Sequence, residues 1–214
     1  MKIKLANLFF IFTFLYSQYL QENQLLWKGV ENLYNYKLDL AISNFDSVMT
    51  IYPENPVAPF VKIAALWLST QIHEGYDSSY SVIYSQVNRT IPFYESLIEK
   101  NDKNAEAFLY LGCTYGIRAR VDLARKEWLN VLYSSYIGYR KIRNAEFLDP
   151  GLVDVNMPNG LLEYYSGMSS LPVQVLANLF SISPNKEKGI EHLMQAVEAK
   201  SYSWIEAAMT LVYC

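Results

Sequence analysis

Apolar residues recur every three to four positions through most of this chain, and Asn, Asp, Pro or Gly separate the periodic stretches. No stretch of useful length alternates apolar and polar residues, so the pattern predicts helices and no sheet. The segment "NAEAFLYLGCTYG", residues 104–116, carries a further spacing, with Phe108, Leu111, Gly112 and Tyr115 on one helical face. A small residue between large ones is more than an amphipathic helix requires, which suggests a packing motif.

This large–small–aromatic spacing recurs along the chain. Phe60, Ala64 and Trp67 repeat it, and Gly29 and Gly160 occupy the small position more loosely. The four small positions are separated by 35, 48 and 48 residues. Self-similarity at such a distance is typical of helical-repeat proteins, in which each repeat is one supersecondary unit.

A second motif, with steps of four and then three residues, follows each of these positions. Its members are Ala41, Phe45 and Val48; Thr90, Tyr94 and Leu97; Gly138, Ile142 and Ala145; and Gly189, Leu193 and Ala196. Small residues on this face let a second helix approach the first closely. The segments "YPENP" and "LDPG" then end the second helix, because proline cannot continue it.

On these residues the chain resembles the tetratricopeptide-repeat (TPR) family, in the long-helix form of bacterial envelope proteins. The resemblance depends on Phe108, Leu111, Gly112 and Tyr115 in one first helix, and on Ala41, Phe45, Pro53, Ala145 and Pro150 in second helices. It implies an all-α, right-handed solenoid of antiparallel helix pairs.

The later period of about 48 residues exceeds the 34 residues of a TPR. The segment around the expected turn at Arg125–Trp128 contains no proline. We therefore expect helices lengthened on both sides of this turn, and not an inserted loop. HEAT-like repeats, with periods of about 40–47 residues, are the alternative.

The N-terminal segment differs from the rest of the chain. A basic start, "MKIK", precedes the uncharged run "LANLFFIFTFLYS", which is shorter than the roughly 20 residues of a membrane span. Residues 1–17 are therefore predicted to be a secretory signal peptide, with an uncleaved anchor or a buried first helix as the alternatives. We expect an exported protein of the periplasm or cell envelope, without an integral membrane span once the signal is cleaved.

Residues 18–214 are then predicted to form one TPR-like domain. Its repeats are expected at roughly 24–55, 56–103, 104–151 and 152–201, with a partial repeat at 202–214.

Three local features modify this pattern. Pro92 is expected to kink or restart its helix near Thr90. Asn156 and Pro158 predict a helix start, with the asparagine as cap and the proline in the first turn. The apolar insertion at 167–186 is expected to be a short helix folded over the groove or an interaction lip, and packing is the favoured interpretation.

The C-terminal stretch "SWIEAAMTLVYC" predicts the first helix of a fifth repeat. Terminal repeats usually have a polar outer face, but this helix contains Met209, Leu211, Val212 and Tyr213. We therefore expect either a chain that continues or a last helix that packs on another protein.

Charge and composition exclude several classes of function. A net charge of −3 without a basic block argues against nucleic-acid binding. Two cysteines make no disulfide framework, and His73 and His192 lie outside any zinc-ligand spacing. Glu95 and Glu99 lie one turn apart, on a face expected to be exposed. We predict no enzyme, no catalytic residue, no cofactor and no metal site.

The remaining candidate is a surface for a protein or peptide partner. The TPR resemblance implies that the first helices line a concave, partner-binding face. The residues it assigns are Trp27, Val30 and Tyr34; Val61, Lys62 and Ala65; Tyr110, Cys113 and Ile117; and Leu161, Tyr164 and Tyr165. Aromatic anchors are typical of binding hot spots, although the same residues could belong to the core.

The function expected from these observations is a non-catalytic scaffold or adaptor of the bacterial cell envelope. One alternative is the binding or regulatory arm of a larger enzyme, with its catalytic part beyond residue 214. Another is a sugar-binding envelope protein, because aromatic surfaces can also stack on sugar rings.

Overall fold

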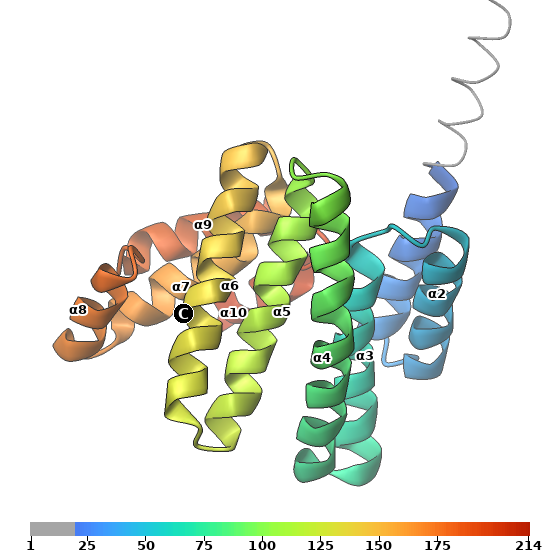
Figure 1. Cartoon of the computed structure of the whole chain (residues 1–214), viewed down its shortest axis with the longest axis horizontal. Helices are drawn as coiled ribbons and strands as arrows, with labels where there is room; N and C mark the ends of the chain where they lie inside the picture. Colours follow the sequence, from blue (N-terminus) through green and yellow to red (C-terminus); the bar gives the residue numbers. More distant parts are fainter. Residues whose placement is uncertain (1–19) are drawn as a thin grey trace, which may run out of the picture.

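The computed structural model describes residues 20–214, apart from the side chains at 172, 173 and 176, and all regular elements in this part are helices (Figure 1). A helix at residues 20–34 is followed by α2 (Leu38–Ile51), α3 (Val57–Glu74), α4 (Tyr76–Lys100), α5 (Ala105–Ala124) and α6 (Trp128–Leu148). The short 3-10 helix η1 (Val153–Val155) leads into α7 (Asn156–Met168), α8 (Leu171–Leu179), α9 (Lys186–Glu198) and α10 (Trp204–Val212). The predicted signal peptide, residues 1–17, lies outside the described residues.

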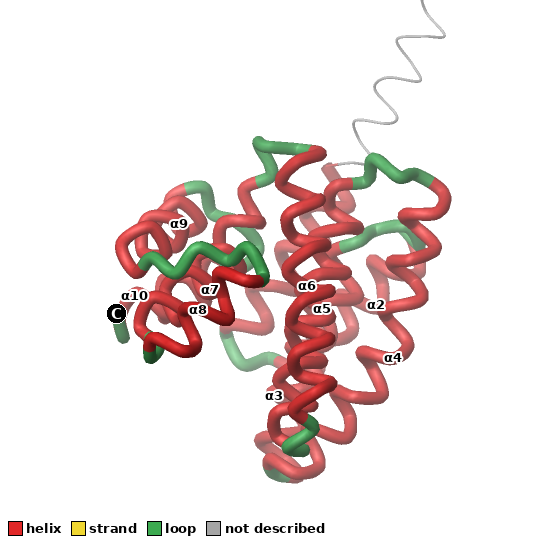
Figure 2. The backbone as a smooth tube through the Cα atoms, turned by 60° about the vertical axis from the view of Figure 1, so that its left-hand side comes forward, coloured by secondary structure: helices red, strands yellow, loops and turns green. Residues whose placement is uncertain are grey.

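Consecutive helices pack side by side as antiparallel pairs. α2 contacts α3, α3 contacts α4, α4 contacts α5, and α5 and α6 form the most extensive pair (Figure 2). α7 then packs on α9, and α9 packs on α10. α8 lies outside this series of packed pairs. The prediction of an all-α solenoid of helix pairs is therefore confirmed.

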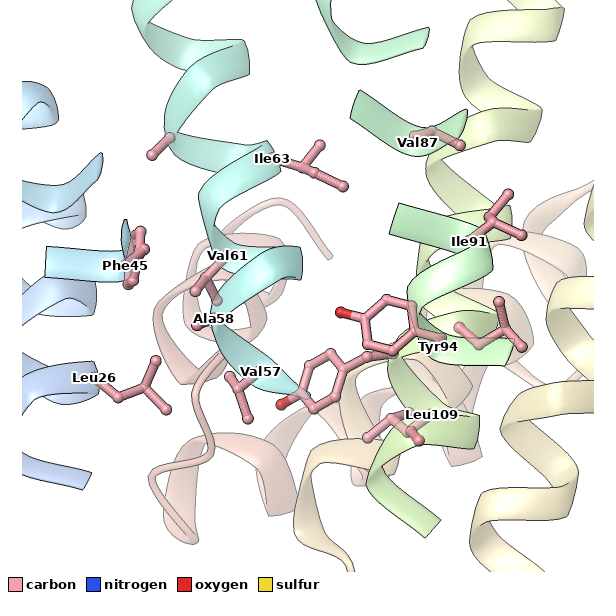
Figure 3. Close-up of a cluster of buried hydrophobic side chains, with 14 of the residues drawn as sticks. Leu26, Phe45, Val57, Ala58, Val61, Ile63, Val87, Ile91, Tyr94 and Leu109 are labelled. Carbon is pink, nitrogen blue, oxygen red and sulfur yellow. The ribbon is translucent and has the colours of Figure 1, made fainter. Parts of the chain in front are cut away.

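One apolar core runs from the first helix through α6. Figure 3 shows Val61 of α3 in the cluster that also contains Phe45 of α2, Tyr94 of α4 and Leu109 of α5. Phe45, Tyr94 and Leu109 are fully shielded from solvent. The Tyr94 hydroxyl donates a hydrogen bond of 2.7 Å to the Pro56 carbonyl oxygen, so the one polar atom of this side chain is satisfied inside the core.

The small residues of the two motifs face each other. A Cβ on Gly112 would lie 2.7 Å from the carbonyl oxygen of Gly138, and one on Gly138 would lie 2.9 Å from the carbonyl oxygen of Gly112. Gly160 of α7 and Gly189 of α9 have the same relationship, with a Cβ of Gly160 2.9 Å from the Gly189 oxygen. The motifs therefore mark the points where paired helices touch backbone to backbone.

Longer helices account for the long period. α5 and α6 have 20 and 21 residues and are joined by a turn at residues 125–127, where the sequence predicts one. α3 and α4 have 18 and 25 residues, and Gly75 alone separates them. Gly75 has a φ of 89°, a conformation that glycine adopts without strain.

Two local predictions are wrong in part: the restart at Pro92 and the asparagine cap of α7. α4 runs without interruption through Pro92 and does not restart there; this proline is exposed, so water can reach the carbonyl group whose hydrogen bond it removes. α7 begins at Asn156, but the capping position belongs to Val155 and no side-chain cap bond forms. Pro158 does lie in the first turn, where a missing N–H costs little.

The C-terminal part of the chain returns to the first helix. The Tyr202 hydroxyl donates to Asn23 Oδ1 at 2.9 Å, across 179 positions of sequence. The Tyr202 ring also lies 4.8 Å from the ring of Trp27, centroid to centroid. The stack of helix pairs therefore curves far enough to close on its concave side.

The insertion before α9 contains α8 and a loop that returns to α6. Tyr139 of α6 donates to the Ser181 carbonyl oxygen at 2.7 Å, and the rings of Tyr136 and Phe180 lie 5.4 Å apart. The insertion therefore packs through its loop, while α8 leaves Leu171 and Leu179 exposed. Within residues 20–214, none of the helices combines the length and the apolar character that crossing a membrane requires.

Candidate functional site: a cavity on the concave side

The closed curvature forms a partly open cavity of about 460 Å³ between the helix pairs. Its walls come from the first helix, α3, α5, α6, η1, α7, the loop after α8 and the start of α10. A pocket of this size is in the range that binds small molecules or the side chains of a partner. We describe it as the concave cavity.

Aromatic and aliphatic side chains form most of its surface. Phe60 and Trp67 project from α3, Tyr110 and Ile117 from α5, and Leu161 from α7. The rings of Phe60 and Tyr110 lie 5.5 Å apart and are tilted by 47°, an arrangement favourable for aromatic pairs.

Glycines shape the side of the cavity formed by α5 and α6. Gly112 and Gly138 both line it, and their backbone contact brings the two helices together. Gly116 lies one turn further along α5, and no heavy atom lies within 4 Å of a Cβ built on it. The absence of a side chain at Gly116 therefore keeps this part of the cavity open.

Asp154 of η1 is a buried carboxylate with a structural role. It accepts a hydrogen bond of 2.8 Å from the Tyr202 N–H. Burial raises the pKa of Asp154, and the hydrogen bond from the Tyr202 backbone opposes this rise. Burial, and then the charge of Asp154, raise the pKa of the Tyr110 hydroxyl. Asp154 therefore links η1 to the segment before α10 and helps close the cavity.

Three polar atoms in the cavity wall are buried without a hydrogen-bond partner among the described residues. They are Nε1 of Trp67, the hydroxyl oxygen of Tyr110 and Oε2 of Glu206. Burial raises the pKa of Glu206 to about 7, and a hydrogen bond with its own backbone opposes the rise. The guanidinium of Arg120, by contrast, is engaged 4.4 Å above the Trp67 ring. The cavity thus has an apolar body with a free indole donor, a tyrosine hydroxyl without a partner and a free acid.

Three side chains of kinds that can act in catalysis, Cys113, His192 and Glu163, lie in two separate places. Burial, followed by the charge of Asp154, raises the pKa of the Cys113 thiol to about 12, which keeps it protonated and unreactive. His192 and Glu163 pair at 2.8 Å between α9 and α7, away from the residues of the cavity. Within residues 20–214, no three His, Cys, Asp or Glu side chains gather where they could hold a metal ion.

Five of the residues assigned to the concave face by sequence line the cavity. They are Tyr34, Tyr110, Cys113, Ile117 and Leu161. The structure thus brings together members of three different helix pairs that lie up to 127 positions apart in sequence.

The other seven residues lie elsewhere. Val30, Val61 and Ala65 are buried in the core; Lys62 forms an ion pair with Asp46 of α2; Trp27 packs on Tyr202; Tyr164 is buried and Tyr165 is exposed. In α3 the residues that face the cavity are Phe60, Ala64 and Trp67, which the sequence analysis identified as packing residues.

Sequence reasoning missed Trp67, Gly116, Asp154 and Glu206 as cavity residues. One feature of the sequence could have identified Glu206 as a site residue: it is the one acid in the apolar stretch "SWIEAAMTLVYC". Asp154 had no such feature, because its position depends on a contact with Tyr202, 48 residues away.

Comparison with known proteins gives few matches. No protein-family model and no curated protein matches the chain. Among solved structures, it is similar to a thermophilic TPR protein of Thermus thermophilus, with 17% identity and a TM-score of 0.46, over 89% of this chain and 82% of that one. It is also similar to a double mutant of MamA RS-1, with 17% identity and a TM-score of 0.34, over 84% of this chain and 75% of that one.

Proposed function

We propose that this TPR-like chain is a non-catalytic scaffold that holds a protein partner in its concave cavity. The observation that carries the proposal is an apolar pocket with three buried polar atoms that have no partner among the described residues: Trp67 Nε1, the Tyr110 hydroxyl and Glu206 Oε2. Buried polar groups without partners cost free energy. A partner that supplies an acceptor and a donor at these atoms recovers that cost, which favours binding.

The outer face of α6 supports a scaffold with more than one contact surface. Exposed apolar residues follow one side of this helix at helical spacing: Trp128, Leu129, Leu132, Tyr133 and Tyr136. Leu129 is 82% exposed, so no described part of the chain covers this end of the helix. Contiguous apolar patches of this kind mark sites of interaction with other proteins.

The substitution Gly116→Leu tests the role of the cavity. A leucine there enters open space and occupies part of the cavity, because no described atom lies within 4 Å of the Cβ position. Glu99→Leu, at an exposed position of α4, is the matched control for an added leucine. Tagged proteins are cross-linked in the native cells and purified, and their partners are compared by quantitative mass spectrometry.

We expect a set of partners that wild type and Glu99→Leu retain and that Gly116→Leu loses. Melting temperatures of the three proteins show that all are folded. Capture of the same partners by Gly116→Leu would overturn the proposal that the cavity binds them.

We further propose that the scaffold works in the bacterial cell envelope after export. The support for this setting is the basic and then apolar sequence of residues 1–17. The test is the intact mass of the protein from its native cells, together with its cell fraction. A mass that begins near Gln18 in a fraction outside the inner membrane is expected. A chain that retains Met1 in the cytoplasm would contradict export.

A further inference from the structure

Glu206 is an acid in the concave cavity that no group of the described chain neutralises. It lies in the first turn of α10, and it lines the cavity together with Ser203. Its Oε2 is shielded from solvent and has no hydrogen-bond partner among the described residues. None of the ion pairs formed within residues 20–214 includes it. An unpaired buried carboxylate is costly, so this position favours a ligand that brings a positive charge.

The basic and acidic neighbours of Glu206 in the cavity wall are already engaged. Arg120 is the basic residue of the wall, and its guanidinium lies over the Trp67 ring. Asp154 is the other acid, and it accepts the Tyr202 N–H. Burial, and not a neighbouring charge, is the main cause of the raised pKa of Glu206. Of the two acids in the described cavity wall, Glu206 is thus the one that remains available for a cation.

The rest of the cavity defines what must carry this cation. Phe60, Ile117 and Leu161 offer apolar surface, which suits a stem of methylene groups. The Trp67 indole N–H has no acceptor within residues 20–214, and a peptide carbonyl oxygen is an acceptor of the right kind. The ligand therefore needs an apolar stem, a cationic end and a carbonyl group.

We infer that the concave cavity binds a lysine side chain of the partner, with its ammonium group on Glu206 and a carbonyl oxygen of its main chain on Trp67 Nε1. This inference rests on the proposed function and names the group that the scaffold recognises. Lysine fits better than arginine, because a compact ammonium needs only one shielded oxygen. A guanidinium is suited to two-point contact with both oxygens of a carboxylate.

The test compares two small probes that differ only at the end of the side chain. N-acetyl-lysine-N-methylamide carries the ammonium, and the norleucine analogue has the same stem without it. Their dissociation constants are measured by NMR titration at pH 8 against wild type, Glu206→Gln and Glu198→Gln. Glu198 is an exposed acid at the end of α9, so its variant controls for the loss of one negative charge.

We expect wild type and Glu198→Gln to bind the lysine probe about tenfold more tightly than the norleucine probe, which corresponds to about 1.4 kcal/mol. Glu206→Gln should bind both probes equally. Equal binding of the two probes by wild type, no binding of either, or a preference for lysine that survives in Glu206→Gln would each overturn the inference. If the probes fail while Gly116→Leu still loses its partners, the scaffold proposal stands and the recognised group is a different one.

Discussion

Gly112 and Gly138 hold α5 and α6 in backbone contact: a Cβ on either residue would lie within 2.9 Å of the carbonyl oxygen of the other. This contact explains why a small residue interrupts the large ones in "NAEAFLYLGCTYG". The same two glycines line the concave cavity. The pair therefore sets both the packing of the central hairpin and the shape of the site.

Alanine at two glycines one turn apart should have opposite effects. Gly112→Ala places its methyl group 2.7 Å from the Gly138 oxygen and 3.0 Å from the Ile142 backbone nitrogen, so the helices must separate. We expect it to lower the free energy of unfolding by about 1–3 kcal/mol. Gly116→Ala meets nothing within 4 Å and should raise it by about 0.5–1 kcal/mol, because alanine favours a helix interior. Urea unfolding of both variants measures these changes, and equal effects would contradict the backbone contact.

The contact between Tyr202 and Asn23 should stabilise the first helix. Tyr202→Phe removes the hydroxyl that donates to Asn23 but keeps the ring beside Trp27. We expect the free energy of unfolding to fall by about 1 kcal/mol. Amide hydrogen exchange in residues 20–34 should become faster. Tyr213→Phe is the control, because Tyr213 is 83% exposed. Unchanged exchange in the first helix would show that the chain does not depend on this closure.

Glu206 should make stability depend on pH. Its pKa in the folded protein is raised to about 7, so the folded state holds the proton more tightly than the unfolded state does. Stability is therefore greater at low pH, and it falls as the pH rises through about 7. Relative to Glu206→Gln, the free energy of unfolding of wild type should fall by about 2 kcal/mol between pH 5 and pH 8.

Urea unfolding at both pH values measures this difference between the two proteins. The comparison cancels the contribution of Asp154, whose pKa is also raised by burial. Parallel pH profiles for wild type and Glu206→Gln would show that Glu206 does not titrate differently in the folded state.

The buried hydroxyl of Tyr94 should contribute more to the stability of the protein than an exposed tyrosine hydroxyl does. Tyr94→Phe leaves the Pro56 carbonyl without the 2.7 Å bond that it accepts in the core. We expect a loss of about 1–2 kcal/mol. Tyr76→Phe, at a residue 66% exposed, should change stability by less than about 0.5 kcal/mol. Thermal unfolding compares the two variants, and similar shifts in Tm would contradict a buried hydrogen bond.

Residue spacing predicted the helix pairs well because it reports directly on packing. Gly112 with Gly138, and Gly160 with Gly189, are small because two backbones meet there, and this need is visible as a fixed step along the chain. The turn near Arg125–Trp128 was predictable for a similar reason: helical periodicity continues on both of its sides.

The site was predicted less well because spacing does not give the rotation of each helix. The sequence assigned Val61 and Ala65 to the concave face, but they are buried in the core, and Phe60, Ala64 and Trp67 line the cavity instead. One residue along a helix is a rotation of about 100°, so a shift of one position moves a side chain to another face. Packing against both neighbouring helices decides that rotation.

The sequence by itself determined the helical class, the paired arrangement and the backbone contacts, because these depend on residues a few positions apart. Tertiary structure alone decided that the stack closes on itself, since Tyr202 meets Asn23 across 179 positions. It also decided that Glu206 lies in an apolar cavity where its Oε2 has no partner among the described residues. The curvature of the stack is the sum of small rotations between successive helix pairs. No local sequence pattern predicts that sum.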